Sequence, residues 1–222
     1  MFKRTIVLGL LLVAALYVIK CVFIGFANME LGEFKPVAAI FLLDTSASNK
    51  NLQDMQEQTI LKISKRLDSE DHALIYIVTE DTYNIYNDNP HKLVMIKNAI
   101  RARGGMDSKN WGTAYGLALK KAVNDALLYK KKGYTPAIVI LGDLENEGDI
   151  SKQINWNTLP SNIEKTKKYI PDLTLAFLYA HPQKLDDVRQ SLLPVIDEKH
   201  LILASEENVD LAVKNLLGTI GR

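Results

Sequence analysis

Two short apolar runs, each ending in an aspartate, restrict the folds open to this chain more than any other feature of it. Residues 37–43 lead into Asp44, and residues 137–141 lead through Gly142 into Asp143. Runs of this length that are rich in Ile, Leu, Val and Phe are typical of strands buried in a parallel sheet. In an open α/β sheet the carboxyl ends of such strands share one edge, and ligands bind there where the strand order reverses. We therefore expect the two aspartates to lie together at that edge.

Further apolar runs alternate with amphipathic segments of helix length. The expected strands are residues 37–43, 72–79, 82–86, 137–141, 172–179 and 201–204, and the expected helices are about residues 51–67, 91–102, 113–132, 183–193 and 206–220. The second and third strands are close enough in sequence to form an antiparallel hairpin at the sheet edge. This alternation predicts an α/β fold: a doubly wound, mostly parallel six-stranded sheet with one antiparallel edge strand and helices on both faces. Residues 148–161 are expected to form an insertion or a short helix in a surface loop.

Hydroxyl groups accompany the two aspartates. Ser46 and Ser48 follow Asp44 at alternate positions in DTSAS, and Thr113 begins TAYGLAL. Alternate residues of an extended turn point to the same side. With Asp143 these side chains form an all-oxygen set with two negative charges, which suits a hard cation such as Mg²⁺, with Mn²⁺ or Ca²⁺ as alternatives. Each residue also has a simpler explanation, because Ser, Thr and Asp are common helix caps and turn residues.

The pattern resembles the von Willebrand factor A-type (vWA) domain and its metal ion-dependent adhesion site (MIDAS) over about residues 36–220. The resemblance is carried by a D-x-S-x-S turn after the first strand, a Thr in a G-T-x-x-G-x-A-L-like helix start, and an Asp after the fourth strand. It implies a Rossmann-like vWA fold and five metal ligands, direct or through water: Asp44, Ser46, Ser48, Thr113 and Asp143. Ala47 and Trp111 stand where glycines are common in that family, and Leu144 stands where Gly usually follows the aspartate.

The amino-terminal segment has a different composition. Residues 5–27 contain one charge, Lys20. At about 1.5 Å per residue, a helix of this length would cross a bilayer core of about 30 Å. We expect residues 1–27 to be a transmembrane signal anchor, residues 28–35 a linker and residues 36–222 the vWA-like domain. The alternative is a cleaved signal peptide, which would leave the domain secreted.

The charges around the apolar segment predict its orientation. Lys3 and Arg4 precede it, and Glu30 and Glu33 follow it. The positive-inside rule then places the amino terminus in the cytoplasm and the large domain outside, in the periplasm or at the cell surface. Cys21 is the single cysteine, so an exported domain would have no disulfide and would depend on its core for stability.

Composition and motifs favour recognition over catalysis. With 27 Lys and Arg against 26 Asp and Glu, the chain lacks the basic excess of nucleic-acid-binding domains. Common hydrolase and nucleotide-binding motifs are absent. We therefore expect a non-enzymatic domain that binds a protein partner, whose Asp or Glu completes the metal shell. Trp111 could be an exposed anchor for that partner or pack beneath its loop, and residues 104–111 and 145–147 are expected around the site.

Two alternatives belong to other functional classes. In one, the domain is a structural subunit of a cell-envelope complex, and the metal only stabilises its loops. The more remote one is a metal-dependent phosphotransfer enzyme of the haloacid dehalogenase type, which also has an Asp after its first strand. Such enzymes usually need a second acid two residues later, and Ser46 occupies that position.

Overall fold

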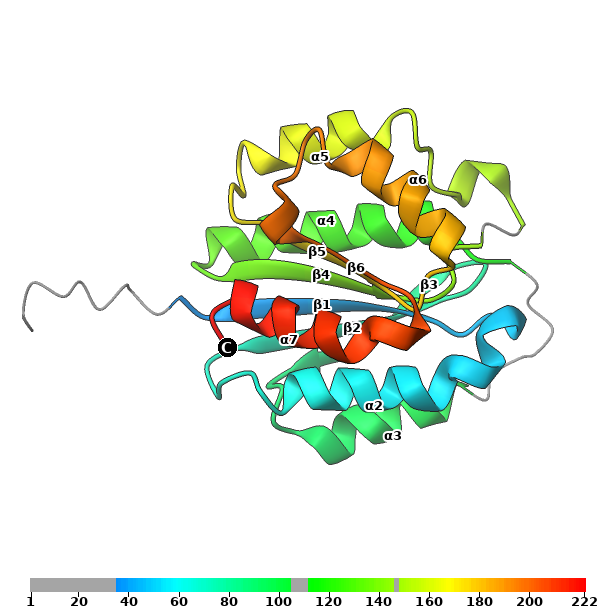
Figure 1. The fold of residues 1–222 in the computed structure, drawn as a ribbon. Helices are drawn as coiled ribbons and strands as arrows, with labels where there is room; N and C mark the ends of the chain where they lie inside the picture. Colours follow the sequence, from blue (N-terminus) through cyan, green and yellow to red (C-terminus); the bar gives the residue numbers. More distant parts are fainter. Residues whose placement is uncertain (1–34, 105–111, 146–147) are drawn as a thin grey trace, which may run out of the picture. The chain divides into compact units, whose positions relative to one another are not determined.

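Six strands form one sheet in the computed structural model, which describes residues 35–104, 112–145 and 148–222 (Figure 1). The strands are β1 (Val37–Asp44), β2 (His72–Val78), β3 (Thr82–Asp88), β4 (Thr135–Leu141), β5 (Thr174–Leu178) and β6 (Leu201–Ala204). Their spatial order is β3-β2-β1-β4-β5-β6. Only β3 runs antiparallel to its neighbour, and it lies at an edge. The predicted mostly parallel sheet with one antiparallel edge strand is confirmed.

Helices cover both faces of the sheet (Figure 1). They are α2 (Gln53–Ser64), α3 (Leu93–Gly104), α4 (Tyr115–Lys131), α5 (Leu159–Lys167), α6 (Pro182–Leu192) and α7 (Val209–Thr219). Short 3-10 helices are η1 (Ala47–Leu52), η2 (Ile150–Lys152), η3 (Glu198–His200) and η4 (Glu206–Asn208). Helices α2, α3 and α7 pack on one face, while α4, α5 and α6 pack on the other.

The central strand β1 contributes to both layers of the core. All eight of its residues are buried. Phe41 and Leu43 pack with the layer under α2, α3 and α7, whereas Ile40 and Leu42 pack with the layer under α4, α5 and α6. Because successive side chains of a strand point to opposite faces, a strand covered by helices on both sides must be apolar throughout. This explains the unbroken apolar run that the sequence shows before Asp44.

The prediction for residues 148–161 was only partly right. The structure has η2 and then a full helix, α5, which extends to Lys167. The polar sequence of α5 conceals it, because only Ile163 and Thr166 of its nine residues are buried. Helix α2 also begins later than expected, since the segment after β1 first forms η1.

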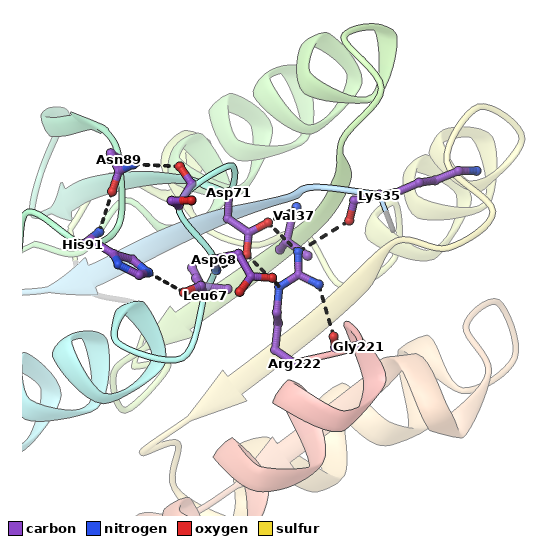
Figure 2. Close-up of polar contacts among 10 residues, drawn as sticks. Lys35, Val37, Leu67, Asp68, Asp71, Asn89, His91, Gly221 and Arg222 are labelled. Atoms are coloured by element: carbon purple, nitrogen blue, oxygen red, sulfur yellow. Dashed lines mark hydrogen bonds and ion pairs between the residues drawn. The ribbon is translucent and has the colours of Figure 1, made fainter. Parts of the chain in front are cut away.

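An ion pair joins Arg222, which follows α7, to Asp71, which directly precedes β2 (Figure 2). The Arg222 guanidinium donates from Nε and Nη2 to the two carboxylate oxygens of Asp71, at 2.7 and 2.5 Å. Asp71 Oδ1 also accepts a hydrogen bond from the backbone N–H of Val37 at 2.7 Å. The two side chains are 4% and 0% exposed, so removal of either partner would leave an uncompensated buried charge.

The expected anchor (residues 1–27), all of the expected linker (residues 28–35) except Lys35, and Trp111 lie outside the described residues. Residues 146–147 also lie outside them. In the part of the chain that the structure describes, no helix combines the length and apolarity needed to cross a membrane. Residues Lys35–Arg222 form one compact unit.

Candidate metal site

The two aspartates leave the sheet side by side at its topological switch point. Strand β1 pairs with β2 on one side and with β4 on the other, and Leu43 lies opposite Leu141. Asp44 and Asp143 therefore follow neighbouring strands at the same edge. They are 0% and 5% exposed, and the negative charge of Asp143 acts on the carboxyl group of Asp44. The structure thus brings the two predicted carboxylates together.

Asp44 is held by three hydrogen-bond donors. Its Oδ1 accepts from the backbone N–H of Ser46 at 2.8 Å, and its Oδ2 accepts from Asn49 Nδ2 at 2.8 Å and from the Tyr115 hydroxyl. A carboxylate has about four acceptor positions, so most of its capacity is already used by the protein. Burial raises the pKa of Asp44 to about 7, while the hydrogen bonds from Tyr115 and Ser46 act in the opposite direction. Asp44 is therefore an anchor for the surrounding loops.

The hydroxyl groups of Ser46 and Ser48 lie 3.1 Å apart. Neighbouring ligands of an octahedral Mg²⁺, each about 2.1 Å from the ion, are about 3.0 Å apart, so this spacing fits two adjacent positions of one coordination shell. Ser46 is the N-cap residue of η1, but its side chain makes no capping hydrogen bond. Ser46 thus occupies the cap position without using its hydroxyl to cap the helix, and that hydroxyl instead hydrogen-bonds the side chains of Ser48 and Asn49.

Thr113 reaches the same edge from the start of α4. Its side chain is buried, and it does not cap the helix, because Ala114 is the N-cap residue and no side chain caps this end. The backbone N–H of Ala114 donates to the carbonyl of Thr79 at 2.7 Å, which fixes this segment to the end of β2. Thr113 lines a cavity of about 220 Å³ together with Glu80 and Lys152.

Asp143 combines a turn role with its position beside Asp44. Its Oδ1 accepts a hydrogen bond from the backbone N–H of Glu145 at 2.9 Å, as an aspartate in a tight turn commonly does. Its other carboxylate oxygen has no hydrogen bond within the described residues, so it keeps acceptor capacity for a further group. The five predicted residues all belong to the carboxyl edge, from the loops after β1 and β4 and the start of α4.

Tyr115 is a site residue that sequence reasoning missed. Its hydroxyl donates to Asp44 Oδ2 and accepts from the backbone N–H of Leu144 at 3.3 Å, so it joins the start of α4 to the ends of β1 and β4. Burial and then the Asp44 charge raise the pKa of this hydroxyl well above its ordinary value. A Cβ on Gly142 would lie 2.1 Å from the Tyr115 oxygen and 2.6 Å from the Asp44 Cβ, so only glycine fits there. The available signal was a tyrosine among the small residues TAYGLA.

Leu144, which departs from the family pattern, has a strained backbone. Its φ is 62°, in the left-handed region that favours glycine. The side chain is 1% exposed and packs in the core layer under α4, so its burial offsets the strain. Tyr179, directly after β5, also has a positive φ of 70°, and its hydroxyl is held by Thr59 Oγ1 at 2.7 Å. Unusual backbone conformations thus follow two of the strands that end at this edge.

The donor set fits a hard divalent cation. Among residues 35–104, 112–145 and 148–222 no cluster of three or more His, Cys, Asp or Glu side chains could hold a metal. A site at the switch point would therefore depend on hydroxyl as well as carboxylate oxygens. Such ligands suit Mg²⁺, Mn²⁺ and Ca²⁺ better than softer metals.

No protein-family model matches the chain, and no curated protein matches it. Solved structures do match it. The vWF domain of the type V pili tip protein Mfa5 from Porphyromonas gingivalis is 13% identical, with a TM-score of 0.60 over 84% of this chain and 95% of that chain. The conserved hypothetical protein BatB from Bacteroides thetaiotaomicron is 15% identical, with a TM-score of 0.57 over 84% of this chain and 100% of that chain.

Proximal thread matrix protein 1 from the mussel byssus is 13% identical, with a TM-score of 0.59 over 83% of this chain. The match covers 48% of the mussel chain, so this chain corresponds to about half of that protein. Another structure of the mussel protein has a zinc-occupied MIDAS motif. At these identities the likeness concerns the fold alone: this chain has the Rossmann-like fold of vWA domains.

Proposed function

We propose that this chain is a membrane-anchored, extracytoplasmic vWA domain that binds a protein partner through a divalent cation. The cation is Mg²⁺, or Mn²⁺ or Ca²⁺ in its place, and the ligands are Asp44, Ser46, Ser48, Thr113 and Asp143. When bound, the ion offers a coordination position to an Asp or Glu side chain of the partner. The role is recognition, without catalysis.

One observation carries the proposal. The Ser46 and Ser48 hydroxyls lie 3.1 Å apart beside Asp44, at the switch point of a doubly wound sheet, and Ser46 does not cap the helix it precedes. Ser46 is buried and Ser48 is exposed, so the pair leads from the protein interior to solvent. The occurrence of the same fold in a pilus tip protein and in a mussel protein with a zinc-occupied MIDAS motif supports an interaction role that depends on a metal.

The five residues would have two different roles: some would contact the ion, and others would orient the loop that carries the ligands. Asp44 is engaged by three protein donors, so it orients the loop more than it offers free oxygen atoms. The direct contacts to the ion then fall mainly on the two serines, with Thr113 and Asp143 completing the protein's share.

Titration of Mg²⁺, then of Mn²⁺, into the full chain in non-ionic detergent tests the site by calorimetry. We expect saturable binding that is lost in Asp44→Ala and retained in the control Ser64→Ala. Ser64 is also buried and polar, but its hydroxyl has no hydrogen-bond partner among the described residues. Equal binding in wild type and Asp44→Ala would refute the site. Protease accessibility of the domain in intact cells tests the extracytoplasmic location.

Partner capture with and without EDTA separates the proposal from its alternatives. A bridging ion predicts that EDTA and Asp44→Ala both abolish capture. If EDTA lowers the melting temperature but leaves capture intact, the ion only stabilises loops of a structural subunit. Mg²⁺-dependent hydrolysis of a phosphate ester, lost in Asp44→Ala, would instead support a phosphotransfer enzyme.

A further inference from the structure

Two buried amide side chains lie beneath the candidate site, and neither the fold nor the predicted ligand set accounts for them. Asn49 and Gln56 are both 0% exposed. Asn49 directly follows the second serine of the turn, and Gln56 lies one turn into α2. They connect the carbonyl group of Leu141, at the end of β4, with the oxygen atoms of the site.

The Leu141 carbonyl determines which way both amides point. A carbonyl oxygen can only accept, so Gln56 must present its NH₂ group to it, and Nε2 lies 3.3 Å away. The same NH₂ group lies 3.5 Å from Asn49 Oδ1, so Asn49 must turn its oxygen toward Gln56. The NH₂ group of Asn49 is thereby directed away from Gln56 and toward the site.

The Asn49 NH₂ group meets three oxygen atoms of the proposed ligands. Its Nδ2 is 2.8 Å from Asp44 Oδ2, 3.3 Å from Ser46 Oγ and 3.4 Å from Ser48 Oγ. The two hydroxyls also hydrogen-bond each other, so the Asn49 amide joins the serine pair and the Asp44 carboxylate in one network. Asn49 is buried whereas Ser48 is exposed, so the amide approaches from the protein side and the solvent side of the hydroxyl pair stays available.

The amide pair costs stability. Gln56 Oε1 is buried and has no hydrogen-bond partner among the described residues. Leaving a buried polar atom unpaired costs about 1–3 kcal/mol. The two side chains thus keep an arrangement that leaves one buried oxygen unpaired, and in that arrangement the Asn49 amide is directed at the proposed ligands.

We propose that Asn49, oriented by Gln56, is a positioning residue that holds the oxygens of Asp44, Ser46 and Ser48 in the arrangement that binds the cation. The inference rests on the proposed function, since it concerns the same ion. Partners of this kind behind metal ligands typically change affinity by about 10- to 100-fold when they are removed.

Calorimetric titration of Mg²⁺ into the full chain in detergent tests the inference. The temperature is chosen so that wild type and all variants are folded. The variants are Asn49→Leu, which removes the donors at similar volume, and Gln56→Met, which removes the orienting amide without touching the ligands. Ser64→Ala is the matched control, because Ser64 is also a buried polar residue of α2. We expect the Mg²⁺ Kd to rise about 10- to 100-fold in Asn49→Leu, less in Gln56→Met, and not in Ser64→Ala.

Each other outcome overturns the inference in a recognisable way. If Asn49→Leu melts at a lower temperature but keeps the wild-type Kd, Asn49 is structural only. If Asn49→Leu binds Mg²⁺ more tightly than wild type, the amide competes with the cation and does not position its ligands. If neither wild type nor any variant binds Mg²⁺ or Mn²⁺ while all are folded, the proposed function fails as well.

Discussion

Replacing Tyr115 with Phe removes one oxygen atom from the centre of the candidate site. That oxygen donates to Asp44 Oδ2 and accepts from the backbone N–H of Leu144. Loss of a hydrogen bond to a charged group costs about 1.5–3 kcal/mol, and loss of the neutral bond to Leu144 costs about 1 kcal/mol. Phe keeps nearly the same volume, so packing around the fully buried ring changes little. We expect the free energy of unfolding to fall by about 3 kcal/mol.

The same substitution should affect the charge of the site. The Tyr115 hydrogen bond lowers the pKa of Asp44, against a burial effect that raises it to about 7. Without the hydroxyl, protonated Asp44 should persist to higher pH. Because a proton and a cation compete for the ionised carboxyl group, the pH at which Mg²⁺ binding reaches half its maximum should rise in Tyr115→Phe.

Urea unfolding in EDTA, and Mg²⁺ titration between pH 5.5 and 8.5, would measure the two effects. Tyr129→Phe is the matched control, because its hydroxyl makes one bond of 3.0 Å to Asn87, an exposed residue. The control should lose less than about 1 kcal/mol. If Tyr115→Phe were no less stable than Tyr129→Phe, and its binding profile were unshifted, Tyr115 would not be the link between α4 and the two aspartates.

Three further predictions concern Asp44, Leu144 and Arg222. The pKa of Asp44 is raised from 3.8 to about 7 in the folded protein. In EDTA the free energy of unfolding should therefore be greatest near pH 4 and fall as the pH rises through 7, by up to about 4 kcal/mol from this residue. Urea unfolding against pH measures this effect, and an Asp44→Asn variant with the same pH slope as wild type would contradict it. Leu144→Gly relieves a left-handed backbone conformation that costs about 1–2 kcal/mol, but it removes a buried side chain worth about 2–5 kcal/mol. We expect the free energy of unfolding in urea to fall by about 1–3 kcal/mol. A more stable variant would show that the strain outweighs the burial. Arg222→Ala leaves buried Asp71 without its ion pair and should lower the stability by about 3–5 kcal/mol. The control Lys62→Ala breaks an exposed pair with Asp210 and should cost less than about 1 kcal/mol. Similar losses for the two variants in thermal unfolding would contradict the burial of the Arg222–Asp71 pair.

The sheet could be predicted from sequence because its central strands are buried on both faces. Residues 37–43 and 137–141 are apolar throughout, and a run of that kind has few alternatives at that length. Helix α5 was predicted only in part because the opposite condition holds there. Only Ile163 and Thr166 of its nine residues are buried, so few apolar residues mark this short helix in the sequence.

The positions of the two aspartates could be predicted for a different reason, namely that they lie at the ends of two neighbouring strands. Asp44 and Asp143 are fixed by the register of β1 and β4, so their meeting follows from the sheet alone. Sequence reasoning missed Tyr115, Asn49 and Gln56, because their role depends on their being buried in the folded protein. A sequence does not show that these polar groups are buried beneath a loop and directed at the same oxygen atoms.

Leu144 is a position where the sequence pattern and the buried contacts of the site can be compared directly. The family pattern favours glycine after the second aspartate, and the structure explains why, because the chain turns through a left-handed conformation there. A leucine adopts it because its side chain is buried in the core layer that also contains Tyr115, and its N–H is bonded to the Tyr115 hydroxyl. That hydroxyl in turn donates to Asp44. The strained turn after β4 and the aspartate at the end of β1 are thus held by one oxygen atom, so a change in the Leu144 backbone should affect the candidate metal site as well as the core.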